Sequence, residues 1–489
     1  MKTIDLSGKP FHFIGIGGIG MSALAYILAK RHIPVSGSDL RVNHITERLE
    51  SVGARIFSRQ EDTNLDIFQS TANQRRPLSA TVRAQSFRGS SGEAKSYLES
   101  LRPQVVCSTA ISASNVEYQA AVERGYEIFH RSDLLAALIQ SYHSIAVAGT
   151  HGKTTTSSLI AYMLLKAGLD PTIIIGGEVE AWQGNARLGQ SRLLVAEADE
   201  SDGSLVKHTP TIGVVTNVEL DHPDHYQTLE DVVAIFRRFA AQSQTLVGCI
   251  DDEIVQELQP DISYSLKSAQ KADYWVTQVR YHSQGSTAQV WERGQLLGRL
   301  QLPLLGQHNL SNALAAVAVG RQVSLGFEEI ASAIATFKGA KRRFEIKGEC
   351  HGITFVDDYA HHPSEIAATL AAARQQRNAQ RTVAIFQPHR YSRTVAFLDE
   401  FATAFSDADR VIVTDIYSAG EVNPGRISGQ QVAEEIARHH PQVCYHSFAT
   451  LKEWLSQELK PGDLALFLGA GNLNQVIPTV MAACSSQNQ

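Results

Sequence analysis

Short apolar runs alternate along most of the chain with stretches in which apolar residues recur at helical spacing. The runs end in Gly, Ser, Asp or Thr, and they lie at residues 11–15, 105–110, 193–199, 212–217, 382–387, 410–415 and 463–471. Strands that are apolar on both faces and separated by helices are typical of parallel sheets covered on both sides. The pattern predicts an α/β fold whose ligands collect at the carboxyl ends of the strands.

The same pattern divides the 489 residues into three units, which agrees with ~150 residues per domain. We expect them over residues 1–141, 142–342 and 343–489, each on a mainly parallel sheet. Within the second unit, residues 274–303 look more antiparallel. Residues 59–98 are polar, rich in Ser and Arg and poor in periodic apolar residues, so we interpret them as a surface insertion.

A glycine cluster follows the first apolar run, in the stretch FIGIGGIGMSALA, where Gly15, Gly17 and Gly20 have the spacing G-x-G-x-x-G. Such a turn at a helix N-terminus presents free N–H groups to a pyrophosphate. Asp39 ends the next strand, where an acid can meet a ribose hydroxyl. A tight turn without a ligand is the alternative. The motif leaves open whether the ligand is a dinucleotide or a UDP-sugar.

A second glycine turn lies in SIAVAGTHGKTTTSSLIAY, residues 144–162. The usual phosphate loop, G-x-x-x-x-G-K-[ST], requires a glycine at position 147, which is Val147 here, and the nearest upstream glycine is Gly149. Strand, turn and helix nevertheless agree with a phosphate site. We expect Lys153 to contact the β- and γ-phosphates and Thr154 to offer its hydroxyl to Mg²⁺. A capped helix with a surface lysine is the alternative.

Acidic side chains and a histidine follow two further strands. Glu197, Asp199, Glu200 and Asp202 lie in VAEADESDGS, and His222 lies in TNVELDHPDHY. Magnesium bound near the phosphate turn needs carboxylate oxygens, and Glu197, closest to its strand, is the best candidate. A metal site shared by Glu197 and His222 is one interpretation. A solvated acidic loop and a structural histidine are the others.

Asn309 and Asn312 are three residues apart at a predicted helix start, in LLGQHNLSNALAA, so their amides can face one target. An asparagine amide can pair with adenine N6 and N7. Helix capping by Asn309 is the alternative.

The third unit concentrates cationic and polar groups at strand ends, in KRRFE, VDDYAHHPSE and FQPHRYSRT. An arginine at the junction, Arg342 or Arg343, could complete a phosphate site when the units close. The remaining groups suit a ligand that carries a carboxylate or a phosphate. They are Asp358, Tyr359, His361, His362, His389, Arg390 and Arg393.

Net charge, the length of the apolar runs and the spacing of the cysteines exclude several classes of function. The net charge of −6 does not favour nucleic acid as a partner. No apolar run approaches the ~18 residues that span a bilayer, and the start lacks the layout of a signal peptide. The five cysteines are scattered without a C-x-x-C pair, so we expect reduced thiols and neither disulfides nor a zinc site. We therefore expect a cytoplasmic protein without membrane insertion.

Taken together, these motifs resemble those of the Mur ligases, through all three units and in the same order. Within that family the phosphate loop reads G-T-x-G-K-[ST], which accounts for Val147. The resemblance implies a Rossmann-like UDP-binding domain, a central P-loop-type ATPase domain and a Rossmann-like C-terminal domain. It also implies ATP and Mg²⁺, or Mn²⁺, as cofactors. No lysine occurs between 208 and 265, so the carbamylated lysine of several sibling ligases should be absent, as in the alanine-adding member.

The resemblance also implies roles for particular residues. For UDP-sugar binding they are Gly15, Gly17, Gly18, Gly20, Asp39, Ser108, Thr109 and Ala110. For ATP they are Gly149, Thr150, His151, Gly152, Lys153, Thr154, Thr155, Asn309, Asn312, Arg343 and Asp358. For the metal they are Thr154, Glu197 and His222, and for the pocket of the sugar-acid carboxyl and the amino acid they are Tyr359, His361, His389, Arg390 and Arg393. Lys153, Glu197, His222, Arg343 and His361 are the expected catalytic set.

The implied activity is ATP-driven amide formation between UDP-N-acetylmuramate and L-alanine through an acyl phosphate, by a monomer or homodimer. His361 or a water linked to His222 would take the amine proton. The nearest alternative is the recycling ligase that adds a tripeptide to the same sugar, although its first glycine motif usually lacks G-G-I-G-M. A nicotinamide oxidoreductase would leave Lys153, Glu197 and the Asn309–Asn312 pair without a purpose. A nucleotide sensor would not need the His and Arg groups of the third unit.

Overall fold

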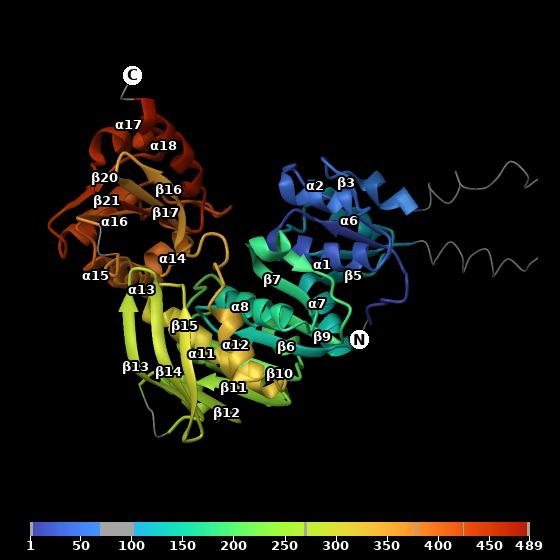
Figure 1. Ribbon diagram of the computed structural model, residues 1–489. Coiled ribbons are helices and arrows are strands. Elements are labelled where there is room, and N and C mark those ends of the chain that lie inside the picture. Colours follow the sequence, from blue (N-terminus) through green and yellow to red (C-terminus); the bar gives the residue numbers. More distant parts are fainter. Residues whose placement is uncertain (1–2, 69–101, 268–270, 377–378, 424, 487–489) are drawn as a thin grey trace, which may run out of the picture.

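The computed structural model describes residues 3–68, 102–267, 271–376, 379–423 and 425–486. These residues form three units, each around its own sheet. The first and third units both sit on the second and face each other across it (Figure 1). Within the described ranges, no helix is both long and apolar enough to cross a membrane.

The first unit is a five-stranded parallel sheet in the order β3-β2-β1-β4-β5. Its strands are β1 (Phe11–Ile14), β2 (Val35–Ser38), β3 (Arg55–Phe57), β4 (Gln104–Cys107) and β5 (Ile128–His130). Its helices are α1 (Ile19–Lys30), α2 (His44–Ser51), the 3-10 helix η1 (Asp62–Asp66), α6 (Val116–Glu123) and α7 (Arg131–Ser141). Because β1 is buried at all four positions, the glycine turn after it lies at the carboxyl edge of a covered sheet.

The second unit is a ten-stranded sheet in the order β15-β14-β13-β12-β11-β10-β6-β9-β7-β8. Its central strands are parallel, whereas β8, β14 and β15 pair antiparallel with their neighbours. The strands are β6 (His143–Ala148), β7 (Thr172–Val179), β8 (Gly184–Arg187), β9 (Leu193–Glu197), β10 (Ile212–Val215), β11 (Thr245–Cys249), β12 (Ile262–Ser265), β13 (Tyr274–His282), β14 (Gly285–Glu292) and β15 (Gln295–Leu302). The antiparallel interpretation of residues 274–303 is therefore confirmed.

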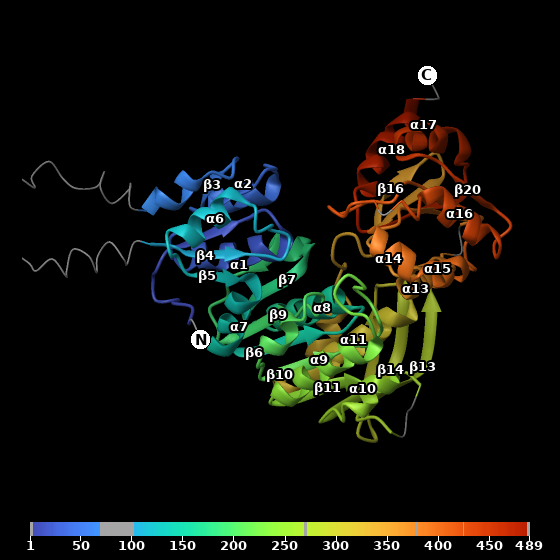
Figure 2. The same ribbon diagram turned by 180° about the vertical axis from the view of Figure 1, so that it is seen from behind.

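Helices cover both faces of this second sheet. α11 and α12 cover the face seen in Figure 1, and α9 and α10 cover the opposite face (Figure 2). The helices are α8 (Lys153–Lys166), η2 (Glu180–Trp182), η3 (Ser204–Lys207), α9 (Leu229–Gln242), α10 (Glu253–Glu257), α11 (Gln307–Gln322) and α12 (Phe327–Ile334). Because helices bury both faces of the sheet, its central parallel strands are continuous apolar runs in the sequence.

The third unit is a six-stranded sheet in the order β16-β17-β21-β18-β19-β20, parallel except for the β16–β17 pair. Its strands are β16 (Glu345–Cys350), β17 (Ile353–Asp358), β18 (Arg381–Phe386), β19 (Arg410–Val413), β20 (Val443–Tyr445) and β21 (Asp463–Leu468). Its helices are α13 (Pro363–Ala373), α14 (Tyr391–Ala396), α15 (Leu398–Thr403), α16 (Gly429–Ala437), α17 (Phe448–Glu458), η4 (Leu473–Val476) and α18 (Ile477–Ser486). The predicted fold, three mainly parallel α/β sheets, is confirmed.

One expectation about the first unit needs correction. The polar segment from residue 59 was interpreted as a surface insertion, yet its first part folds into η1. Leu65 is fully buried there, and Asn64 donates a hydrogen bond to the buried carboxylate of Glu117 on α6 (2.5 Å). A single apolar residue anchors this turn, too few to produce a periodic pattern. The rest of the predicted insertion, from residue 69, lies outside the described residues.

Candidate active site

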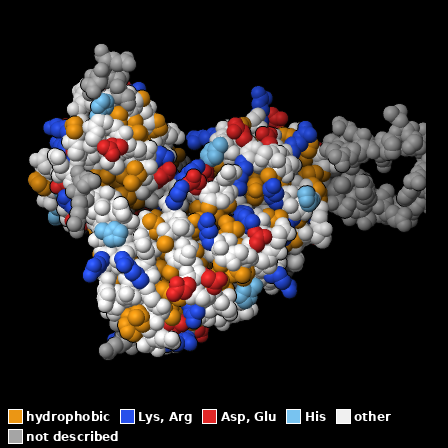
Figure 3. All heavy atoms as spheres, viewed as in Figure 1, with side chains coloured by type: hydrophobic (Ala, Val, Ile, Leu, Met, Phe, Trp, Pro, Cys, Tyr) orange, Lys and Arg blue, Asp and Glu red, His pale blue; other side chains and the backbone are white. Residues whose placement is uncertain are grey.

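A cleft of about 910 Å³ opens where the three units meet. Charged side chains gather at its mouth, between the first and third units (Figure 3). Its walls combine the glycine turn of the first unit, the phosphate loop of the second and the strand ends of the third. Groups that the sequence placed in separate motifs of the three units are therefore brought to one cavity.

The phosphate loop joins β6 to α8 and is tied to the end of β10. Gly149 has φ of +137°, and a Cβ there would lie 1.9 Å from Thr216 Oγ1, so only glycine fits. The backbone N–H of His151 donates to Asn217 Oδ1 (2.8 Å). Gly152 precedes the helix with φ of +81°, and no side chain caps its first turn. The free N–H groups at the start of α8 therefore remain available to an anion.

Lys153 begins α8, and its ammonium folds back over the loop. Its Nζ donates to the carbonyl oxygens of Gly149 (2.7 Å) and Thr150 (3.1 Å) and to Glu200 Oε1 (2.8 Å). Burial raises the pKa of Glu200 to about 7, against the opposing charge of Lys153. Against burial, the charges of Glu200 and Asp199 raise the pKa of Lys153, so the lysine stays charged at the phosphate loop, next to a carboxylate that can take up a proton near neutral pH.

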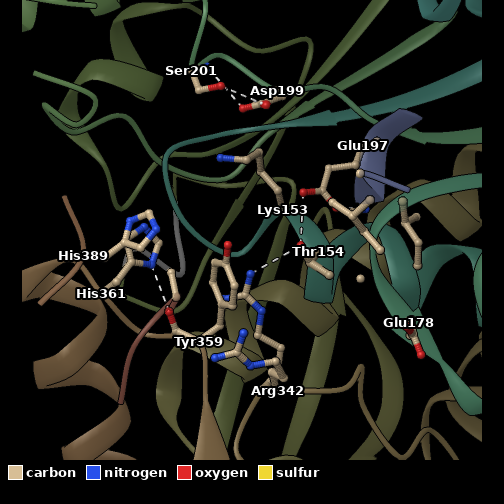
Figure 4. Close-up of a pocket in the computed structure, with 18 of the residues that line it drawn as sticks. Lys153, Thr154, Glu178, Glu197, Asp199, Ser201, Arg342, Tyr359, His361 and His389 are labelled. Atoms are coloured by element: carbon tan, nitrogen blue, oxygen red, sulfur yellow. Dashed lines mark hydrogen bonds between the residues drawn. The ribbon is translucent and has the colours of Figure 1, made fainter. Parts of the chain in front are cut away.

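An oxygen-rich cluster lies beside this lysine. Thr154 Oγ1 donates to Glu197 Oε1 (3.1 Å; Figure 4), and Glu197 Oε2 accepts from the backbone N–H of Gly176 (2.7 Å). Arg343 reaches the same hydroxyl from the junction with the third unit, with Nη2 3.4 Å from Thr154 Oγ1. A hydroxyl and a carboxylate side by side are the ligand types that a hard divalent cation prefers.

His222 also lines the cleft, with a positive φ of 56°. Its Nε2 lies 3.6 Å from Asp221 and 3.8 Å from Glu200. Burial lowers the pKa of His222, which favours the neutral ring that a metal requires. The predicted sharing of one ion by Glu197 and His222 stays a prediction.

Two residues of the predicted acidic loop have a partner that the sequence did not reveal. Arg131, at the start of α7 in the first unit, pairs with Asp199 (2.8 Å) and Asp202 (3.3 Å) of the second. Burial opposes ionisation of Asp199, but Arg131 and Lys153 hold its pKa well below its usual range. Arg131 follows a strand, as the other site residues do, which is the signal that could have found it.

The paired asparagines lie on the first turn of α11, packed against the phosphate loop. The cap of this helix is Gly306, so the capping alternative for Asn309 is wrong. Asn309 instead donates to the carbonyl of Leu305 (2.7 Å) and accepts from Asn312 Nδ2 (3.3 Å). A Cβ on Gly152 would lie 2.7 Å from Asn312 Oδ1. The amides are thus within reach of the loop, although both are buried, and neither lines the described part of the cleft.

The predicted pocket of the third unit faces the phosphate loop across the cleft. Tyr359, His361, His389, Arg390 and Arg393 all line it. The rings of His361 and His389 lie 5.8 Å apart, edge to face, on the side opposite Thr154 and Glu197 (Figure 4). The structure therefore brings all five together, as the pattern of strand ends suggested.

Arg393 holds two neighbours of this pocket. Its Nε donates to Asp221 Oδ1 of the second unit (2.9 Å), and its Nη1 donates to His389 Nδ1 (3.2 Å). Burial and the nearby positive charges lower the pKa of His389 to about 2. His389 is therefore neutral, and because guanidinium nitrogen can only donate, the ring proton lies on Nε2.

Two junction residues, Asp358 and Arg342, contact other groups of the third unit in this conformation. Asp358 accepts from the N–H groups of Phe344 (2.7 Å) and Ala360 (2.7 Å), and burial raises its pKa to about 6. It does not line the described part of the cleft. The guanidinium of Arg342 packs over the ring of Tyr359, 4.9 Å from its centroid. Arg343, not Arg342, is the one that contacts the phosphate-loop hydroxyl.

The glycine turn of the first unit reaches the cleft through part of its predicted set. Gly18, Gly20, Ser108 and Thr109 line it, whereas Gly15, Gly17, Asp39 and Ala110 lie behind. Asp39 Oδ2 accepts from the backbone N–H of Gly17 (2.9 Å). A Cβ on Gly17 would lie 2.8 Å from that oxygen, so a side chain there would displace the carboxylate.

A further group, missed in the sequence, joins the phosphate loop to the third unit. His151, Glu219 and His362 lie with their ligand atoms within 4.8 Å of one another, the one such group among the described residues. Ser364 Oγ donates to Glu219 (2.7 Å), and Glu365 Oε1 pairs with His151 Nδ1 (3.2 Å). Hydrogen bonds to Glu219 and Glu365 outweigh burial and raise the pKa of His151 to about 9.

Comparisons with known proteins agree with the motifs. Family models match in three consecutive parts: Mur ligase family, catalytic domain, at residues 10–143; Mur ligase middle domain at 147–320; and Mur ligase, glutamate ligase domain, at 342–471. Proteins named UDP-N-acetylmuramate–L-alanine ligase are similar to this chain. The one from Gloeothece citriformis is 64% identical over 99% of both chains, and the one from Nostoc punctiforme is 64% identical over 99% of this chain and 98% of its own.

Solved structures give the same result. The structure of UDP-N-acetylmuramate-alanine ligase MurC from Thermotoga maritima matches with a TM-score of 0.78 and 25% identity, over 98% of this chain and 100% of that chain. A murein peptide ligase from Psychrobacter arcticus shares the fold, with a TM-score of 0.69 and 21% identity over 98% of this chain and 99% of that chain. The nicotinamide oxidoreductase alternative is thereby overturned. Because the three family domains cover most of its length in order, the chain belongs to the Mur ligase family.

Proposed function

We propose that this chain joins L-alanine to the lactyl carboxylate of UDP-N-acetylmuramate at the expense of ATP, as its relatives' names imply. The observation that carries the proposal is the convergence of Lys153, Thr154 and Arg343 in one cleft with the His and Arg groups of the third unit. A phosphate site therefore faces a pocket suited to carboxylates. That juxtaposition is what ATP-driven amide formation requires, since the activated acyl group must meet an amine.

ATP is assigned to the phosphate loop and its neighbours. The backbone from Gly149 to Thr155, His151 included, would surround the phosphates, with Lys153 at the transferred group. Asn309 and Asn312 would contact adenine, which requires their amides to leave the hydrogen bond they share. Asp358 would hold the ribose once the third unit moves onto the nucleotide.

UDP is assigned to the glycine turn after β1, with Ser108 and Thr109 facing it at the end of β4. The sugar would then extend along the cleft toward the phosphate loop. The pocket of the third unit would hold L-alanine. Arg390 and Arg393 would attract its carboxylate, and His389, neutral with the proton on Nε2, would donate a hydrogen bond to it.

The side chains near the phosphate loop provide the ligand atoms that a divalent cation requires. Thr154 and Glu197 supply a hydroxyl and a carboxylate 3.1 Å apart, and neutral His222 lies in the same cleft, so the residues fit Mg²⁺ or Mn²⁺. When bound there, the ion would offset the charge of the phosphates. Side chains of this protein carry out the other steps, which are binding the substrates, stabilising charge and excluding water.

In the first half of the reaction, the lactyl carboxylate attacks the γ-phosphate and gives an acyl phosphate and ADP. Lys153 in the phosphate loop and Arg343 beside Thr154 stabilise the negative charge that develops on the transferred group. In the second half, the neutral amine of alanine attacks the acyl carbon and phosphate leaves. Closure of the third unit would keep water from the acyl phosphate.

The cleft needs no second chain, because all three units that line it belong to one. A monomer therefore suffices for activity, and a homodimer would be compatible with it. We place the reaction in the cytoplasm, where ATP and nucleotide sugars are available. UDP-N-acetylmuramate and L-alanine are the expected substrates.

Phosphate release from ATP tests the proposal. It should require both UDP-N-acetylmuramate and L-alanine, with glycine and L-serine as poorer amines, and it should be lost in Lys153→Ala. Release with a tripeptide but not with alanine would instead identify the recycling activity. Release that does not depend on the nucleotide sugar would overturn the ligase proposal.

A further inference from the structure

We propose that Glu365 is a positioning residue for amide formation: it holds His361 with the proton on Nδ1, so that Nε2 is free to take a proton from the incoming amine. This inference rests on the proposed function. It names the base that the sequence left open, and it assigns a task to a carboxylate that no motif had singled out. Both residues line the cleft.

The hydrogen bonds of His361 determine its tautomer. Nδ1 lies 2.9 Å from the carbonyl oxygen of Tyr359 and 3.1 Å from Glu365 Oε2. A carbonyl and an ionised carboxylate can only accept, so Nδ1 must carry the proton. In the neutral ring, Nε2 then keeps its lone pair. A carboxylate that orients an imidazole in this way also stabilises the imidazolium that forms after proton transfer.

Glu365 is well placed to remain ionised. It lies in the first turn of α13, and its Oε2 accepts from the backbone N–H groups of His361 (3.0 Å) and His362 (3.4 Å). Its side chain is only 13% exposed. Despite burial, the imidazoles of His361 and His151 hold its pKa well below the usual range. The first turn of α13 therefore holds the carboxylate of Glu365 in place, and this carboxylate orients the ring of His361.

The second oxygen of Glu365 reaches the phosphate loop. Oε1 pairs with His151 Nδ1 at 3.2 Å, so one carboxylate contacts both the loop that would bind ATP and the ring that would accept the amine proton. The contact forms only when the third unit is docked on the second. The base is thus aligned in the same docked arrangement that holds the phosphate loop against it.

Three other histidines of the cleft and its rim, His389, His362 and His222, are less suited. His389 Nδ1 accepts from Arg393, so its Nε2 carries the proton. His362 Nδ1 accepts from the backbone N–H of Ser364 (3.3 Å), which places its proton on Nε2 as well. His222 lies against Asp221 and Glu200 on the metal side of the cleft. Among these rings, His361 is the one whose pattern of partners leaves a free lone pair on Nε2.

Charged and titratable groups around His361 come from several elements. Glu365 faces it from α13, Tyr359 from the end of β17 at 5.3 Å between rings, and His389 from the end of β18 at 5.8 Å. Asp221 of the second unit and Arg393 of α14 form a buried ion pair beside them. The charges of Asp221 and Arg393 offset each other, which leaves Glu365 as the carboxylate in direct contact with the ring.

One proton moves from the alanine ammonium to His361 Nε2, and the freed nitrogen lone pair forms the bond to the acyl carbon. A second proton then leaves that nitrogen for the departing phosphate, and the bond from the acyl carbon to the phosphate oxygen breaks. Phosphate leaves with the electron pair, and the proton on His361 passes to solvent or to the departing phosphate. No oxidant or further reactant is required.

The test separates the two halves of the reaction. Hydroxylamine, whose amine is largely unprotonated near neutral pH, can replace alanine and trap the acyl phosphate as a hydroxamate without a base. We compare Glu365→Gln with Ser364→Ala, the matched control, which removes the neighbouring hydrogen bond to Glu219 but leaves the His361 pair intact. Both are assayed for hydroxamate and for alanine ligation, with kcat and the KM for alanine determined across pH.

In Glu365→Gln, kcat for alanine should fall at least tenfold, toward the ~10²–10⁴ that a general base contributes, while hydroxamate formation stays within about threefold. The deficit should shrink as pH rises, because more alanine is then unprotonated. In a His361→Asn background the same change should cost nothing further. Ser364→Ala should behave as the parent enzyme.

Two results would overturn the inference. Equal loss of hydroxamate and alanine ligation would mean that Glu365 acts only by supporting the phosphate loop through His151. A kcat for alanine in Glu365→Gln that matches Ser364→Ala would mean that the carboxylate has no such role. If the parent enzyme forms no sugar-dependent hydroxamate, the proposed function itself fails, and this inference with it.

Discussion

Arg393→Ala should loosen the docking of the third unit on the second. Arg393 and Asp221 form an ion pair across the two units at 2.9 Å, with 3% and 6% of their side chains exposed. Removing the arginine leaves a buried carboxylate without its cation. In the undocked state both groups would be hydrated, so the change weakens docking and leaves each sheet intact.

The structure sets the size of the effect. Breaking a buried pair by removing one partner costs about 3–5 kcal/mol. Asp221 keeps one hydrogen bond, from the backbone N–H of His222 (2.7 Å), which places the cost near the lower end. About 3 kcal/mol corresponds to a roughly 100-fold shift toward the undocked state. The exposed Arg374–Asp409 pair within the third unit, at 43% and 35% exposure, is the control, and its loss should cost at most ~1 kcal/mol.

Trypsin cleavage in the junction measures docking without substrates. Arg342 and Arg343 are consecutive trypsin sites there, and undocking exposes their partly buried side chains, whereas Lys341 is exposed already. When reclosing outpaces cleavage, the cleavage rate follows the undocked population, so it should rise about 100-fold in Arg393→Ala and change little in Arg374→Ala.

The pH dependence of docking should be reversed in Arg393→Ala relative to the parent protein. In the parent protein, Arg393 outweighs burial and holds the pKa of Asp221 well below its ordinary value, so its contribution to docking is present above pH ~4 and is lost as pH falls. In Arg393→Ala the unpaired carboxylate should favour docking when protonated, and cleavage should slow from about pH 8 to about pH 5. A cleavage rate within about twofold of the parent, or no recovery when Asp221→Asn is added, would refute this account.

Three further predictions concern the phosphate loop and its metal. Lys153→Met should lower sugar-dependent phosphate release by about 10²–10³-fold, the usual cost of losing one group that stabilises transition-state charge, and an unchanged rate would contradict its role. Gly149→Ala should abolish release, because its Cβ would lie 1.9 Å from Thr216 Oγ1, whereas Gly168→Ala, with φ of +76° and nothing within 4 Å, should keep activity and lose only ~1 kcal/mol of stability. Chelation by EDTA should stop phosphate release, and excess Mg²⁺ should restore it. Phosphate release that continues in the presence of EDTA would exclude the assigned cation. A fourth prediction concerns pH: because the folded pKa of His151, about 9, exceeds the unfolded ~6.5, its docking contribution should be complete below pH ~6.5 and lost toward pH 9, seen as faster junction cleavage in the parent but not in His151→Asn.

Local patterns determined much of the molecule in advance. The apolar runs became strands because strands buried on both faces need apolar side chains at every position. The phosphate loop was recognisable because its glycines, Lys153 and Thr154 are consecutive, and their roles depend on the backbone of a single turn. The strand ends that carry His361 and Arg393 were placed together because parallel strands in one sheet end at one edge.

Short segments without a pattern could not be placed in this way. The turn at residues 62–66 looked like part of a surface insertion because one buried leucine, Leu65, leaves no periodic signal. Helix capping was the alternative for Asn309, yet the helix begins two residues earlier, after a glycine whose φ is +92°. Such boundaries depend on tertiary packing rather than on propensity.

Partnership between distant side chains was decided by the tertiary structure alone. Asp221 and Arg393 are 172 residues apart, and Arg131 meets Asp199 across 68. Glu365 reads in the sequence as an ordinary residue of a helix start, and only docking of the third unit on the second places it between His361 and His151. Periodicity reports which face of an element is buried, but not which other element covers it. The reactive side chains of this cleft therefore belong to local motifs of each unit, whereas their charges and tautomers are determined by the contacts between the units.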